Sequence, residues 1–295
     1  MNGGSKDKGY TLVEVMIFLA VTGALFVMAM VAINGKQAQA EFATGVRDFN
    51  SRIQSIINEV NNGYFPENAS YNCKFAGGLP GAALDLSTGG SPSGQGTHPD
   101  CVFLGKVVYF DFTVLPASQV DDFHIITVAG GAYNDKRQPI TTYSASRPAP
   151  VAGPASSVDL SETAKVTNGL IVSQLISKAG AAVDPNISAF AIFTSLPQYN
   201  INTTSGSLSA NTVSIPNSDR TDSLAITYSN ILSIATSTPT VNDTIAICLQ
   251  HGVGGKKAAI IVGTQSRQLY AEVHIADADS AVQNNVTGIG GTTCP

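Results

Sequence analysis

An apolar run near the N-terminus constrains this chain more than any other feature of its sequence. The run covers residues 15–33, nineteen residues without a charge (VMIFLAVTGALFVMAMVAI). With residues 10–14 it would form a helix of roughly 36 Å, enough to cross a bilayer. Lys6 and Lys8 precede the run, and positive charge before a first apolar segment favours a cytoplasmic N-terminus. The sequence therefore predicts one membrane span, with the remaining chain exported.

Three kinds of N-terminal segment are compatible with such a run. A secretory signal would be cut after Ala38-Gln39-Ala40, but its apolar region usually has only about 7–15 residues. A permanent single-span anchor is the second kind. Glu14 favours a third kind, a segment in which a charged partner neutralises the carboxylate. A carboxylate at the start of an apolar run is costly unless it lies at headgroup level or has such a partner.

The residues around Glu14 resemble a known family. Gly9-Tyr10-Thr11-Leu12-Val13-Glu14, followed by the apolar run, is similar to the type IV prepilin signature. The resemblance implies cleavage between Gly9 and Tyr10 by a dedicated peptidase, N-methylation of Tyr10, and pairing of Glu14 with the terminal amine of a neighbouring subunit. Tyr10 replaces the phenylalanine usual in this family and remains aromatic. A carboxylate and an ammonium paired in an apolar core also offset each other's desolvation, which agrees with this role.

An apolar stripe continues the helical pattern beyond the run. Its members are spaced by four, three, four, three and four residues: Phe42, Val46, Phe49, Ile53, Ile56 and Val60. Charged residues occupy the other side, and Asp48 and Arg52 have the spacing of an i, i+4 pair. We expect one helix over residues 11–61, ended by Asn61-Asn62-Gly63. Because the stripe spans fewer than three heptads, packing on a following sheet is favoured over a coiled coil.

The remaining sequence predicts a β-rich head. β-Branched and aromatic residues indicate strands at 101–114, 123–128, 189–194, 244–249, 257–262 and 267–275, with turns at 251–255 and 263–266. Two polar segments, 143–167 and 200–244, are expected to be loop insertions. The predicted fold class is α+β, with one long helix on an antiparallel sheet. The predicted division is a leader at 1–9, a membrane or filament-core helix at 10–33, an amphipathic half at 34–62 and a head at 63–295.

The last strands of the head carry a second resemblance. Residues 245–250, 257–263 and 267–269 are similar to the strand, turn and strand of the GspH/FimT subgroup of minor pilins and pseudopilins. Some relatives of FimT take up DNA through a basic C-terminal motif. This chain lacks that motif and has only a weak basic patch around its last hairpin, made of Lys256, Lys257 and Arg267. With a formal net charge of -5, nucleic acid is an unfavoured partner.

The four cysteines predict disulfides, because all lie on the exported side of the span. Three pairings are possible. We expect the two pairs that are local in sequence, Cys73 with Cys101 and Cys248 with Cys294. The second pair resembles the disulfide that closes a C-terminal loop in many pilins.

Metal sites are weaker alternatives. His98 with Cys101, and Cys248 with His251, have ligand-like spacing for zinc, but Cys-x-x-Cys pairs are missing. Two short acidic groups could hold calcium, although such turns are usually just solvated: Asp121, Asp122 and His124, or Asp277 and Asp279. We expect no metal and no cofactor.

Taken with the resemblance, these features predict a structural protein rather than an enzyme. The sequence has no nucleophile elbow and no phosphate-binding loop. The resemblance implies a subunit of a type IV pilus or pilus-like filament that serves adhesion, motility, secretion or DNA uptake. Its expected partners are the prepilin peptidase and methyltransferase, other pilin subunits, the assembly platform and, before assembly, the cytoplasmic membrane. The alternative is a membrane-anchored or secreted β-rich binding protein that does not polymerise.

Overall fold

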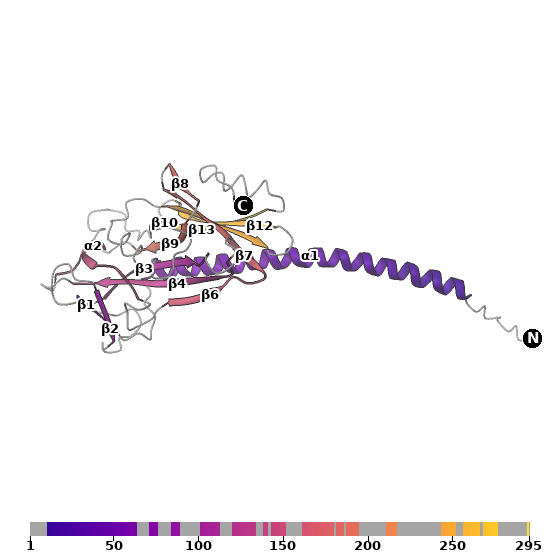
Figure 1. The fold of residues 1–295 in the computed structure, drawn as a ribbon, viewed down its shortest axis with the longest axis horizontal. Coiled ribbons are helices and arrows are strands. Elements are labelled where there is room, and N and C mark those ends of the chain that lie inside the picture. Colours follow the sequence, from indigo (N-terminus) through magenta and orange to yellow (C-terminus); the bar gives the residue numbers. More distant parts are fainter. Residues whose placement is uncertain are drawn as a thin grey trace, which may run out of the picture.

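The computed structural model describes most of the long helix and the strands of the head. The described residues are 11–63, 71–75, 84–88, 101–112, 120–133, 138–140, 143–151, 161–179, 181–185, 187–194, 211–216, 243–251, 256–265, 268–276 and 294. Figure 1 shows the first half of helix α1 (Leu12–Asn61) extending away from a head in which its second half is embedded. The α+β class predicted from the sequence is confirmed.

Two antiparallel sheets make up most of the described head. The six-stranded sheet has the order β10-β9-β3-β4-β5, with β6 also paired to β4, and the five-stranded sheet has the order β13-β12-β11-β7-β8. The strands of the first are β3 (Cys101–Phe110), β4 (Asp122–Gly131), β5 (Ala149–Pro150), β6 (Ser161–Lys165), β9 (Ile187–Phe193) and β10 (Asn211–Pro216). Those of the second are β7 (Leu170–Ala179), β8 (Ala182–Asp184), β11 (Thr244–His251), β12 (Lys257–Gln265) and β13 (Gln268–Ala276). A separate hairpin pairs β1 (Tyr71–Phe75) with β2 (Leu84–Thr88), and α2 is a short helix (Tyr143–Ser146).

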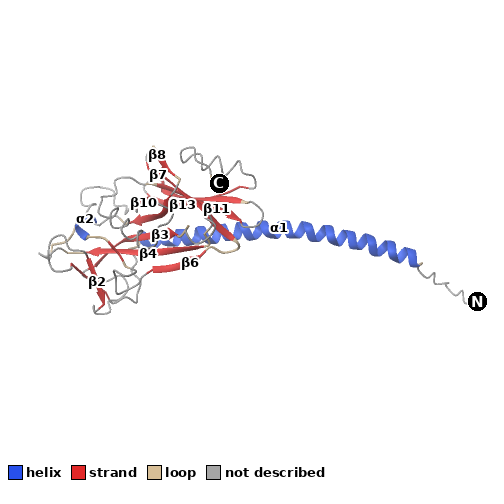
Figure 2. Ribbon diagram, in the orientation of Figure 1, coloured by secondary structure: helices blue, strands red, loops and turns tan. Residues whose placement is uncertain are grey.

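Helix α1 packs against both sheets through its predicted apolar stripe (Figure 2). All six residues of the stripe are at most 4% exposed. Phe49 makes edge-to-face ring contacts with Phe110 of β3 and Phe123 of β4, at centroid distances of 6.4 and 5.3 Å. The periodicity that predicted the helix therefore also identified the face that holds the head to it.

Polar contacts on both flanks of the stripe join the helix to the sheets. Arg52 forms an ion pair with Glu162 of β6, so the expected pair with Asp48 is replaced by a contact to the sheet. Lys106 of β3 is buried and forms an ion pair with Glu59. Gln54 Nε2 donates a 2.8 Å hydrogen bond to the carbonyl of Ala271 in β13. These contacts fix how the second half of the helix sits on the sheets.

Parts of the predicted insertions are strands. Strands β5 and β6 fall within 143–167, and β10 falls within 200–244. The residues of β6 pair with β4 but remain largely exposed, which explains why their polar sequence resembles a loop. β12 also extends through Gln265 into the predicted turn at 263–266. β7 was not predicted from the sequence, and the head is richer in strands than expected.

Asp243 closes the outer edge of strand β10. Its backbone N–H donates to the carbonyl of Thr212 at 2.9 Å, and its carboxylate accepts 2.6 Å bonds from the backbone N–H and the hydroxyl of Ser214. Thr212 also donates its hydroxyl to the Asp243 carbonyl. Because β10 is the last strand of its sheet, these bonds occupy backbone groups that an edge strand would otherwise leave open.

We expect Asp243→Ala to lower the free energy of unfolding by about 2 kcal/mol, because it leaves the Ser214 N–H in a partly buried site without its acceptor. The measurement is guanidinium unfolding of the full chain in detergent. Asp48→Ala is the control, because it removes an exposed carboxylate from the helix without breaking a bond to the described head. Equal midpoints for the two variants would contradict this role of Asp243.

Candidate functional site

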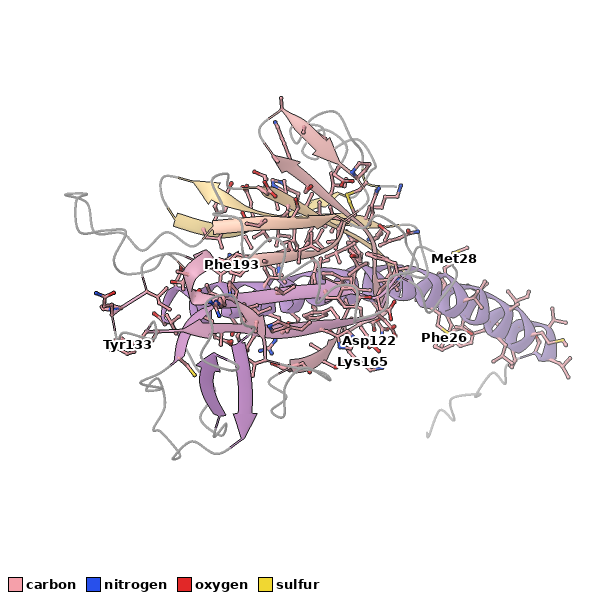
Figure 3. All side chains as sticks on the ribbon, turned by 60° about the vertical axis from the view of Figure 1, so that its left-hand side comes forward. Phe26, Met28, Asp122, Tyr133, Lys165 and Phe193 are labelled. Atoms are coloured by element: carbon pink, nitrogen blue, oxygen red, sulfur yellow. A yellow bond between two sulfur atoms is a disulfide. The ribbon has the colours of Figure 1, made fainter. Side chains whose placement is uncertain are left out.

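The first half of α1 is an apolar surface that the described head leaves uncovered. Residues Leu12–Met30 are long and apolar enough to cross a membrane, and none of their side chains is buried. Figure 3 shows Phe26 and Met28 projecting from this part of the helix, outside the head. An apolar surface of this extent needs lipid or other apolar helices around it. By length and composition alone, however, this stretch also resembles a signal sequence.

Local hydrogen bonds satisfy the threonines at the start and middle of this surface. Thr11 is the N-cap of the helix, and its hydroxyl accepts a 3.3 Å bond from the Glu14 N–H. Thr22 donates its hydroxyl to the carbonyl of Phe18 at 2.9 Å. Thr22 thus keeps its donor paired in an apolar environment without help from another chain.

The Glu14 carboxylate is different, because nothing in the described part of the chain neutralises it. The Thr-x-x-Glu spacing of Thr11 and Glu14 would allow a capping box, in which the glutamate accepts from the N-cap N–H. The bond from the Glu14 N–H to Thr11 is present, but no hydrogen bond or ion pair reaches the Glu14 carboxylate from the described residues. The Glu14 carboxylate therefore lies at the start of an apolar surface without a compensating group among the described residues.

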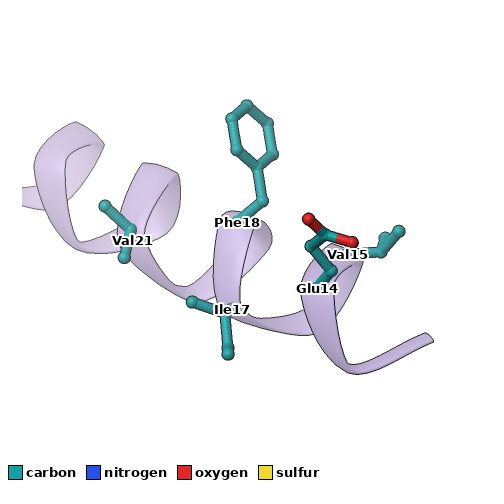
Figure 4. Close-up of a pocket in the computed structure, with 5 residues that line it drawn as sticks. All are labelled: Glu14, Val15, Ile17, Phe18 and Val21. Carbon is teal, nitrogen blue, oxygen red and sulfur yellow. The ribbon is translucent and has the colours of Figure 1, made fainter. Parts of the chain in front are cut away.

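The surroundings of Glu14 are apolar. Val15, Ile17, Phe18 and Val21 line a hollow beside it on the helix surface. Figure 4 shows Glu14 and Phe18 on the same side of the helix, one turn apart, with Ile17 pointing the other way. A cationic group that reached this carboxylate would meet apolar side chains next to it, which would reduce its contact with water.

The predicted cleavage site precedes this helix. Gly9 and Tyr10 lie outside the described residues, so their roles stay predictions. Thr11, which follows them, has an extended backbone with φ -77° and ψ 149°, and the helix begins at Leu12. The helix then continues without interruption through Ala38-Gln39-Ala40, where a secretory signal would be cut.

The cysteines lie in the head, far along the chain from Glu14. Cys248 and Cys294 form a disulfide with a Cα–Cα distance of 5.5 Å, and both are buried against the five-stranded sheet. Cys101 is also disulfide-bonded, whereas the side chain of Cys73, its expected partner, lies outside the described part of the structure. Because Cys101 and Cys248 are disulfide-bonded, they cannot supply the thiolates that the zinc alternatives require.

The other candidate site residues do not form one site among the residues described. Lys256 and Lys257 are half-buried at the start of β12, and Arg267 lies outside the described residues. Asp122 pairs with Lys165 at 3.4 Å, visible in Figure 3, and His124 Nδ1 contacts the Thr163 hydroxyl at 3.0 Å. Asp277, Asp279 and His98 lie outside the described residues. The described residues contain no group of three or more potential metal ligands.

Comparison with known proteins places the recognisable part of the chain at its N-terminus. Residues 4–30 match the family model of the prokaryotic N-terminal methylation motif. The match includes Gly9, Tyr10 and Glu14 and supports the type IV pilin and pseudopilin family for this chain. No curated protein and no solved structure matches the chain, and the GspH/FimT-like hairpin is not confirmed.

Proposed function

We propose that this chain, with its prepilin-type N-terminus, is a structural subunit of a type IV pilus or pilus-like filament. The observation that carries the proposal is the Glu14 carboxylate, which stands without a described partner at the start of an exposed apolar helix. In the filament, Glu14 pairs with the terminal amine of Tyr10 in a neighbouring copy. The pair offsets the desolvation of both charges, which either group alone would have to bear.

The same helix serves two environments in this proposal. Before assembly, residues 10–33 hold the subunit in the cytoplasmic membrane with the head outside. During assembly, the apolar half leaves the lipid and packs among identical or related helices, so its side chains remain in apolar surroundings throughout. The head moves with the helix because the stripe of α1 and the Lys106–Glu59 ion pair join them.

The proposed partners follow the order of these steps. A prepilin peptidase and methyltransferase cleaves after Gly9 and methylates Tyr10, the assembly platform extracts the subunit, and other pilin subunits surround it. Pilin-type proteins are typically structural, and this chain acts by assembly rather than catalysis. Adhesion, motility, secretion or DNA uptake is the downstream use of the filament.

The test is the N-terminal mass and sequence of the protein isolated from its native cells. We expect a chain that begins with N-methylated Tyr10, since the motif covers the predicted cleavage site. A Gly9→Val variant is the matched control, because a bulky residue at this position should retain the leader and leave Met1 or Asn2 at the N-terminus. A wild-type chain that begins at Glu41 would instead identify a secreted protein. One that retains residues 1–9 would identify an anchored protein, and both results would overturn the proposal.

A further inference from the structure

The second half of α1 has one face that the head does not cover. Between Glu41 and Ser51 the exposed residues on this face are Glu41, Thr44, Arg47, Asp48 and Ser51. They lie opposite the apolar stripe, whose side chains are packed into the head. We call these five residues the open face of α1. It contains acidic residues (Glu41 and Asp48) and a basic residue (Arg47) within two turns of the helix.

The charged residues of the open face differ from their neighbours on the same helix in having no partner in the described part of the head. Arg52 and Glu59 form ion pairs with Glu162 and Lys106. Among the described residues, neither Arg47 nor Asp48 takes part in a hydrogen bond or ion pair. The described part of the head therefore pairs with the charges on the flanks of the helix and with neither the Arg47 nor the Asp48 side chain.

The shape of the subunit directs the open face toward other copies in a filament. The apolar halves must pack together to remove their surface from water, and the heads are too wide to fit among them, so the heads lie outside. α1 is one continuous helix, and the head covers the side opposite the open face. The open face is thus turned inward, where unpaired charges are costly because less water is available.

The register that pairs Glu14 with a neighbouring Tyr10 amine also sets the level of the open face. Glu14 and Tyr10 are four residues apart, so two parallel helices would be offset by roughly 6 Å. At that offset Asp48 of one copy lies level with Thr44 of the next. Arg47 of the second copy is then about 4.5 Å further along, less than one helical turn and within the reach of an arginine side chain.

We infer that the open face is an interface between copies of this chain, in which Arg47 of one copy pairs with Asp48 of its neighbour. This inference rests on the proposed function, since it requires helices packed side by side. At the offset that Glu14 and Tyr10 set, these opposite charges lie within reach of each other, so the pair adds electrostatic complementarity to the staggered arrangement. The open face thereby contributes a polar contact between copies, while the Glu14–Tyr10 pair sets the register and the apolar half supplies the burial.

Charge reversal at the two positions, singly and together, tests the pairing. We expect Arg47→Glu and Asp48→Arg, each alone, to reduce sheared filament at least about tenfold, because each places like charges at the contact. The double variant Arg47→Glu with Asp48→Arg has the wild-type net charge and should recover filament to within about threefold of wild type. Lys178→Glu is the control: it reverses a charge on β7, away from the open face, and this variant should assemble like wild type. Cleavage after Gly9 and formation of the Cys248–Cys294 disulfide are measured in every variant to establish processing and folding.

The outcomes separate the two proposals. Normal assembly of both single variants, or a double variant as defective as the single ones, would overturn the Arg47–Asp48 contact and leave the proposed filament function standing. Processed wild-type protein that forms no filament in its native cells would overturn both. Recovery in the double variant alone supports the contact, because a general loss of stability would not be reversed by a second charge change.

Discussion

Replacing Glu14 with alanine is expected to lower the amount of assembled filament at least about a hundredfold while cleavage after Gly9 continues. Removing one member of a buried ion pair typically costs about 3–5 kcal/mol, since the remaining charge is left without compensation. In the proposed filament the remaining charge is the Tyr10 amine of a neighbouring subunit. The unassembled subunit loses little, because the Glu14 carboxylate has no described partner there. The effect should therefore fall on assembly and not on the amount of membrane-held protein.

The measurement is the ratio of sheared filament to membrane-held protein, with the N-terminal sequence of each fraction. Glu14→Gln should also assemble poorly, because it keeps the shape but not the charge. Thr22→Val is the matched control: it changes a polar residue in the same apolar half, and the Thr22 hydroxyl is bonded to its own helix. Filament from the Glu14→Ala variant at the wild-type level would refute the proposed pairing and favour the anchored protein that does not polymerise.

The sequence predicted α1 well because its signals are local. Thr11 lies at the start, the apolar stripe repeats at the helical period, and Asn62 ends the helix. The central strands β3, β4, β9, β11 and β12 were also recognisable, since strands buried on both faces have continuous apolar sequences. In each case the residues that determine the element are neighbours in the chain.

The missed strands depend on contacts that are distant in sequence. β6 and β10 lie at the edges of their sheet, so their sequences remain polar and resemble loops. β7 had a local signal, because the dipeptide Asn168-Gly169 indicates a turn before an apolar run, and both residues have positive φ, at 61° and 67°. The turn does not close a hairpin, however, since β6 and β7 belong to different sheets. The distinction between two sheets and one could not be read from strand patterns alone.

The candidate site likewise has residues that the sequence identifies and residues that only the fold identifies. Glu14 was recognisable because a carboxylate beside an apolar run is a local anomaly. Arg47 and Arg52 are equivalent in sequence, both charged and both outside the apolar stripe. Only the position of β6 shows that Arg52 pairs with the head, whereas Arg47 has no partner among the residues that the structure describes. The open face of α1 thus emerges from the fold and not from the helical pattern.

Gly105→Ala is expected to destabilise the head by at least about 3 kcal/mol, a large effect for the addition of one methyl group. Gly105 lies at a bulge in β3, where the register with β4 shifts between Phe103 and Gly105. Its φ of 153° is one that side chains rarely adopt, and a Cβ atom would lie 2.1 Å from the Ile192 carbonyl oxygen and 2.9 Å from the Phe193 Cα atom. Both obstacles are backbone atoms of β9, held by pairing on both sides, so they cannot move aside as a flexible side chain can.

Gly263→Ala is the matched control in β12. Its Cβ atom would approach the Thr244 side chain at 3.3 Å, and its φ is not in the unfavourable range, so a loss below about 1 kcal/mol is expected. Both variants are compared with the wild-type full chain in detergent by guanidinium unfolding, followed by near-ultraviolet circular dichroism of the tyrosines. Similar midpoints for the two variants would mean that β3 and β9 can separate at Gly105 at little cost. A much lower midpoint for Gly105→Ala alone would locate the rigid centre of the head at the β3–β9 contact, next to Lys106 and its ion pair with the helix. The orientation of the head on α1, and hence of the open face, would then depend on that contact.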